Sequence, residues 1–141
     1  MPLIVATGIV GLDPMGMNKS GDQAVPASST DLKVINWTAR SGYPNTVITN
    51  NELIANGGGA VVVRCGVSVT GTLFMTTRRF QLMHNDTAVK TVDTDQATVA
   101  LSDTSLTLAF GDRLWLSMTQ PATYSATIVG GVNTYVYYDL A

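Results

Sequence analysis

Charged residues are scarce in this sequence. Asp, Glu, Lys and Arg make up 13% of the 141 residues, and the formal net charge is −2. That share is about half of what soluble domains usually carry. A surface with so little charge must be covered by Thr, Ser, Asn and Gly, or be partly hidden in an interface. The eight Lys and Arg residues form no basic stripe, so we expect no nucleic-acid partner.

Residue types that commonly act in catalysis or bind metals are rarer still. The sequence has one Cys (Cys65), one His (His84) and one Glu (Glu52). A metal site would need further ligands beside His84, and nucleophilic catalysis would need a base oriented toward a Ser, Thr or Cys. Glycoside hydrolysis would need paired carboxylates. Cys65 lies in an apolar run, as a small buried hydrophobe would. We therefore expect no enzyme, no catalytic residue, no metal and no cofactor.

The aspartates allow two interpretations. Asp is a common turn former, and this role is favoured because the spacing of the aspartates matches no calcium-binding loop. Binding of Ca²⁺ at loop tips stays open as the alternative. The residues concerned are Asp86, Asp93, Asp95, Asp103 and Asp112.

Signals for export and for membrane insertion are also missing. The N-terminus lacks the basic region and the long apolar core of a signal peptide, and no apolar run reaches the length of a membrane span. We therefore expect a protein made in a cytoplasm, with no membrane partner.

No ten-residue window has the periodicity of an amphipathic helix. Instead, short apolar runs alternate with polar residues between Gly, Asn and Asp turns. In residues 60–70 the odd-numbered positions are apolar, which predicts a strand with those positions inward. This pattern predicts an all-β fold, a β-sandwich or barrel of about ten short antiparallel strands. The expected strands are residues 32–37, 47–54, 60–70, 73–83, 87–92, 97–101, 105–110, 113–120, 126–129 and 134–140.

Residues 1–31 differ in composition from the rest. They contain four Gly and three Pro, which disfavour regular strand pairing. We therefore predict two parts: an extended N-terminal arm, residues 1–31, and the sandwich, residues 32–141. The arm is too apolar for a solvated tail, so we expect it to bind a partner. Its apolar residues are Leu3, Ile4, Val5, Ile9, Val10, Leu12, Met15 and Met17.

Three segments carry a resemblance to a known family. They are RFQLMHNDTAV at 79–89, LTLAFGDRLWL at 106–116 and TYVYYDL at 134–140. Over roughly residues 50–140 the chain resembles the trimeric jelly roll shared by tumour necrosis factors and the globular heads of complement and collagen-like proteins. This resemblance implies a jelly-roll β-sandwich. The chain lacks their collagen-like stem. In overall style it also resembles small structural proteins of tailed bacteriophages, in which a short apolar arm precedes a Thr-, Val- and Gly-rich sandwich.

Three aromatic residues are candidates for an interface. Trp115 alternates with apolar neighbours in one expected strand, and Tyr135 and Tyr137 do so in the last one. If the apolar neighbours face the core, these three aromatics point outward, as the core of an interface would require. The resemblance implies that these strands lie near a three-fold axis. The competing interpretation places the aromatics in the core, partly covered by the arm.

These observations favour a structural protein of a virion. We expect a homotrimeric capsid decoration (cement) protein on the surface of a tailed-phage head, assembled in the host cytoplasm. Its partners would be itself and the major capsid protein, which the arm would bind. Two alternatives stay open. One is a minor tail or fibre-tip protein that binds a host receptor or carbohydrate, and the other is a bacterial surface binding module.

Overall fold

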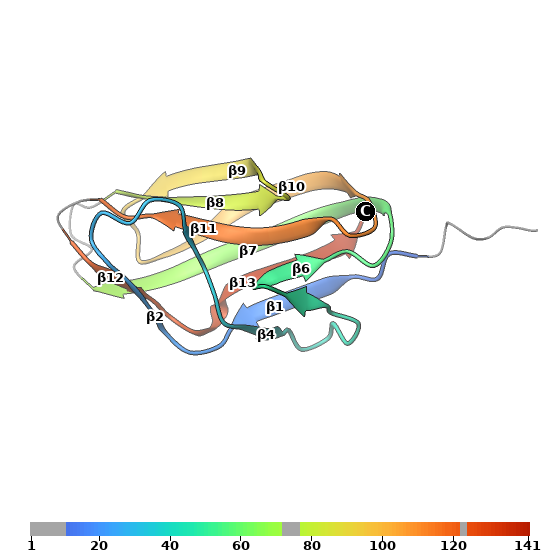
Figure 1. Cartoon of the computed structure of the whole chain (residues 1–141), viewed down its shortest axis with the longest axis horizontal. Coiled ribbons are helices and arrows are strands. Elements are labelled where there is room, and N and C mark those ends of the chain that lie inside the picture. The colour runs from blue at the N-terminus through green and yellow to red at the C-terminus, as the bar shows by residue number, and fades with distance from the viewer. Residues whose placement is uncertain (1–10, 72–76, 122–123) are drawn as a thin grey trace, which may run out of the picture.

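The chain forms a sandwich of two antiparallel sheets (Figure 1). The computed structural model describes residues 11–71, 77–121 and 124–141. Within these ranges thirteen strands occur and no helix, so the predicted all-β sandwich is confirmed. Among the same residues, no helix is long and apolar enough to cross a membrane.

The first sheet has seven strands. Its order is β2–β12–β7–β13–β1–β4, with β10 also paired to β7. Its strands are β1 (Met15–Lys19), β2 (Gln23–Val25), β4 (Trp37–Ala39), β7 (Gly59–Gly71), β10 (Thr98–Leu108), β12 (Ala126–Ile128) and β13 (Gly131–Leu140).

The second sheet has six strands. Its order is β5–β6–β11–β8–β9, with β3 also paired to β11. Its strands are β3 (Leu32–Lys33), β5 (Ile48–Thr49), β6 (Glu52–Ile54), β8 (Arg78–His84), β9 (Thr87–Thr94) and β11 (Arg113–Thr119).

β7 is the longest strand, and it pairs with β10, β13 and β12. Its odd-numbered apolar residues point inward as predicted, since all five are at most 2% exposed. They belong to the same core cluster as the buried residues of β8 and β11. The five are Val61, Val63, Cys65, Val67 and Val69.

β10 is one strand where the sequence predicts two. The expected turn at residues 102–104 is a break in the register between Leu101 and Thr104, within continuous pairing to β7. An extra residue in one strand of an antiparallel pair produces such a bulge without ending the strand. The polar residues there therefore resemble a turn in sequence but lie within a strand.

The predicted boundary at residue 31 is wrong, because the sandwich already includes β1 and β2. β1 lies between β13 and β4. Met15 and Met17 are fully buried in the core and Leu12 is 5% exposed, so these three residues are not free to bind a capsid. This five-residue strand is hard to recognise in the sequence, because its apolar alternation is short and lies among Gly and Pro. The other predicted arm residues, Leu3, Ile4, Val5, Ile9 and Val10, lie outside the described residues.

Two truncations test the corrected boundary. A chain that starts at Gly11 keeps β1, and we expect it to unfold cooperatively with a melting temperature close to that of the full chain. A chain that starts at Ser20 loses Met15 and Met17. Burial of each such side chain is worth about 1.5–3 kcal/mol, a large fraction of a typical stability of about 5–15 kcal/mol. We expect the shorter chain to show no cooperative transition by circular dichroism. A native-like transition in it would contradict the assignment of β1 to the core.

Candidate functional site

Tyr135 and Tyr137 point out of the sandwich, as predicted. In β13 they alternate with Val136 and Tyr138, which are fully buried. Trp115 likewise alternates with the buried Leu114 and Leu116 of β11. However, β11 and β13 belong to different sheets. Trp115 therefore lies on the opposite outer face from the two tyrosines, and the three residues form no common surface.

The two tyrosines belong to an aromatic cluster that we call the tyrosine face: Arg40, Tyr43, Tyr135 and Tyr137. The ring centroids of Tyr135 and Tyr137 are 5.7 Å apart, and those of Tyr43 and Tyr137 are 5.6 Å apart. The Arg40 guanidinium lies 4.6 Å from the Tyr137 centroid and 5.1 Å from that of Tyr135. Such aromatic and cation–π contacts hold the rings in a fixed arrangement.

Two glycines make room for the rings. Gly66 of β7 pairs with Tyr135, and a Cβ atom at Gly66 would lie 2.8 Å from Tyr135 Cε1. Gly16 of β1 pairs with Tyr137, and a Cβ there would lie 2.8 Å from Tyr137 Cβ. Because neither glycine has a side chain, the tyrosines can lie over the neighbouring strands.

Charged side chains border the tyrosine face. The Tyr43 hydroxyl donates a hydrogen bond of 3.1 Å to Asp139. Arg64 forms ion pairs with Asp103 at 3.3 Å and with Asp139 at 3.4 Å. Burial, followed by the hydrogen bond to Asp139, raises the pKa of Tyr43 to about 12. Burial also raises the pKa of Tyr135. Both hydroxyls are therefore neutral near pH 7, and Arg40 is the charged member of the cluster itself.

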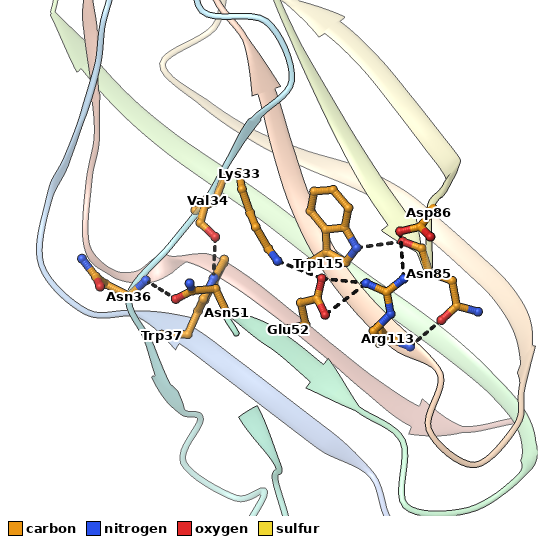
Figure 2. Close-up of polar contacts among 10 residues, drawn as sticks. All are labelled: Lys33, Val34, Asn36, Trp37, Asn51, Glu52, Asn85, Asp86, Arg113 and Trp115. Carbon is orange, nitrogen blue, oxygen red and sulfur yellow. Dashed lines mark hydrogen bonds and ion pairs between the residues drawn. The ribbon is translucent and has the colours of Figure 1, made fainter. Parts of the chain in front are cut away.

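Trp115 is held by a polar network within its own protein (Figure 2). Its indole nitrogen donates a hydrogen bond of 2.8 Å to the Asn85 carbonyl, and Lys33 Nζ lies 4.9 Å from the ring centroid. Glu52, 5% exposed, accepts from Lys33 at 2.8 Å and from Arg113 at 3.0 Å. These contacts connect β3, β6 and β11, so they account for Trp115 without a partner protein.

Arg40 and Tyr43 were not predicted from the sequence. Arg40 precedes and Tyr43 lies within residues 41–45, which read as a turn and carry no strand periodicity. Tyr43 is placed by a turn in which its amide donates to the Arg40 carbonyl at 3.1 Å, while the Arg40 amide donates to Gly16 at 2.8 Å. The pairing of β1 with both β13 and β4 brings this turn beside Tyr137.

The residues singled out for chemistry are dispersed. His84 is hydrogen-bonded to Asp112 at 2.8 Å at the end of β8. Cys65 is buried in the core, and burial raises the pKa of its thiol to about 12, so it stays protonated. Glu52 serves the network around Trp115. Within residues 11–71, 77–121 and 124–141, no group of three or more His, Cys, Asp or Glu residues is placed to hold a metal ion.

No protein-family model and no curated protein sequence matches the chain. Solved structures do share its fold. The Eiger TNF of S. frugiperda is 14% identical, with a TM-score of 0.62 and 92% of each chain covered. Murine APRIL is 10% identical, with a TM-score of 0.59 and coverage of 93% of this chain and 100% of that one. Pika GITRL is 16% identical, with a TM-score of 0.50 and coverage of 86% and 96%. The protein therefore has a TNF-like jelly-roll fold.

Two Tyr→Phe variants, one on β13 and one in the turn beside it, test how the tyrosine hydroxyls contribute to stability. Tyr138 is fully buried, and among the described residues its hydroxyl has no hydrogen-bond partner. Tyr138→Phe removes an unsatisfied group, so we expect stability to be unchanged or raised by up to about 1 kcal/mol. Tyr43→Phe loses the bond to Asp139 and should cost about 1 kcal/mol. The check is urea unfolding at pH 7, and a marked loss in Tyr138→Phe would contradict the expectation.

The same bond predicts a pH dependence. The folded-state pKa of Tyr43, about 12, lies above its ordinary value of 10.0. The stability linked to this group is thus present below pH 10 and is lost as the pH rises through about 12. Comparing urea unfolding of the protein and of Tyr43→Phe between pH 9 and 12 should show their stability difference shrinking with pH.

Proposed function

We propose that the protein is a non-enzymatic structural module that forms a homotrimer through the tyrosine face. The single observation that carries this proposal is the outward cluster of Tyr43, Tyr135 and Tyr137 on the seven-stranded sheet. Closed cyclic symmetry is the usual arrangement of soluble homo-oligomers. Packing the same face of three copies around an axis would cover all three rings in each copy.

The tyrosine face has the composition of an interface core. Tyr and Arg are enriched at the centre of protein interfaces, where they carry much of the binding energy, and charged side chains are found mainly at the rim. Here the ion pairs of Arg64 with Asp103 and Asp139 lie beside the rings, where they neutralise one another's charge. The opposite outer face centres on Glu52 and its two cations, and charges of this kind are depleted in interface cores.

Within this class we propose a capsid decoration protein on the outside of a tailed-phage head. Two features support it: the low charge of the chain, and the five apolar residues among positions 1–10 that precede the sandwich. Apolar segments from three chains that act together would multiply a weak individual attachment. The attachment region proposed is now residues 1–10, because Leu12, Met15 and Met17 belong to the core.

Charge at the tyrosine face tests the trimer. In Tyr135→Asp and Tyr137→Asp, the three new carboxylates would meet near the axis and lose hydration without gaining partners. We expect both variants to be monomeric at micromolar concentration in native mass spectrometry, where the unmodified protein is a trimer. Thr91→Asp on β9 adds the same charge to the other sheet and should remain trimeric. A monomeric unmodified protein would overturn the proposal.

Copy number tests the place in the virion. We expect quantitative mass spectrometry of particles produced by the genome that encodes this chain to find it in hundreds of copies per particle. A few copies would indicate the tail or fibre tip instead. Absence from the particles would exclude a structural role in the virion.

A further inference from the structure

The turn between β10 and β11 exposes a phenylalanine. Phe110 is 80% exposed, the highest value among the large apolar side chains of the described residues. Single exposed apolar residues are ordinary on protein surfaces. Phe110 differs because several hydrogen bonds hold the turn that carries it.

Asp112 fixes the turn from within. Its amide donates to the Ala109 carbonyl at 3.0 Å, and its Oδ2 accepts the Ala109 amide at 2.9 Å. The same carboxylate is hydrogen-bonded to His84 at 2.8 Å and accepts from the side-chain amide of Asn85 at 3.3 Å. Ala109, which precedes Phe110, is thereby positioned through Asp112 from the neighbouring β8–β9 turn.

A second set of bonds ties the turn to the end of β6. The Gly111 amide donates to the Ala55 carbonyl at 2.8 Å, and the Ala55 amide donates to the Asp112 carbonyl at 2.9 Å. Gly111 has a φ of +87°, which glycine adopts without strain. Because the backbone of the turn is already fixed, binding through Phe110 would not have to order the loop.

The same end of the sandwich also carries Leu140, 53% exposed, and the junction with residues 1–10. In Figure 1 the β10–β11 turn, the start of β7 and the C-terminus lie together at this end. A Cβ atom at Gly57 would lie 2.8 Å from the Leu12 amide nitrogen, and one at Gly58 would lie 3.3 Å from the Leu108 carbonyl oxygen. Gly57 is thus in contact with the first described residues, and Gly58 is in contact with the end of β10.

We propose that this end of the sandwich is a docking surface for a protein partner, and that Phe110 is its anchor in an apolar pocket of that partner. The inference rests on the proposed capsid role and adds to it which end of the jelly roll faces the particle. The apolar residues 1–10 join the sandwich at Gly11, beside the Phe110 turn. A partner that binds Phe110 would therefore lie next to Gly11, the point where the apolar N-terminal sequence continues from the sandwich.

The charges near Phe110 favour protein over lipid. Anionic membranes attract clusters of Lys and Arg, but the nearby charged groups are mostly carboxylates. Asp13 exchanges hydrogen bonds with Asn56 at 3.0 and 2.7 Å, and Asp112 is held within the turn. Arg113 is paired with Glu52 and Asp86. A partner with an apolar pocket suits this surface better than a charged bilayer.

Binding to particles that lack this protein tests the proposal. Such particles would be purified from a host carrying the encoding genome with this gene disrupted. We expect the trimer to bind them, and Phe110→Ser to bind on the order of tenfold or more weakly, since truncation of a central aromatic anchor has effects of this size. Phe110→Leu, which keeps an apolar side chain, should lie between the two. Val132→Ser is the matched control, because Val132 is 66% exposed at the other end of β13, and it should bind like the unmodified protein.

The outcomes separate the two proposals. Equal binding of the unmodified protein and Phe110→Ser, with unchanged melting temperatures, would remove the docking surface and leave the capsid role intact. Failure of the unmodified trimer to bind would overturn the capsid role and the docking surface with it. Sedimentation with phosphatidylcholine vesicles that depends on Phe110 would assign this end to a lipid surface and overturn the protein partner.

Discussion

The structure depends on the pairing of β7 with β13 and β10 at the centre of the seven-stranded sheet. One face of this unit supplies the valines that close the core against β8 and β11. The other face supplies the glycine over which Tyr135 lies. Because side chains alternate strictly along a strand, a shift of one residue in the pairing of β7 with β13 would turn one strand over relative to the other. It would place either the tyrosines of β13 on the core face or the valines of β7 on the outer face.

The tyrosine face shows how glycine and aromatic residues cooperate in a sheet. A glycine within a strand has no side chain to pack and usually weakens the strand. Here Gly66 and Gly16 are covered by Tyr135 and Tyr137, so the neighbouring side chain supplies the missing contact. The result is a surface of tyrosine rings that pack on the strand backbone beneath them and on Arg40 and Tyr43 at their side.

The sequence predicted what depends on strand periodicity, namely the sandwich, the inward row of β7 and the outward direction of Trp115, Tyr135 and Tyr137. It did not predict which strands share a sheet, because that is decided by contacts between residues far apart in the chain. Trp115 was therefore grouped with the wrong surface. β1 was missed for a related reason: Met15 and Met17 give too short an alternation to stand out among Gly and Pro, and only its pairing with β13 and β4 makes it a strand. Arg40 and Tyr43 lie beside a turn, where the sequence carries no sign of their neighbours.

The position of β1 has a mechanical consequence. A pull on the chain at Gly11 is passed to Met15–Lys19, which is hydrogen-bonded to β13 on one side and to β4 on the other. The bonds of an antiparallel pair run across the strands, so tension along β1 loads them together in shear instead of opening them one after another. A segment attached before Gly11 would therefore be anchored between two strands of a sheet, and both neighbours would share the resistance to extraction.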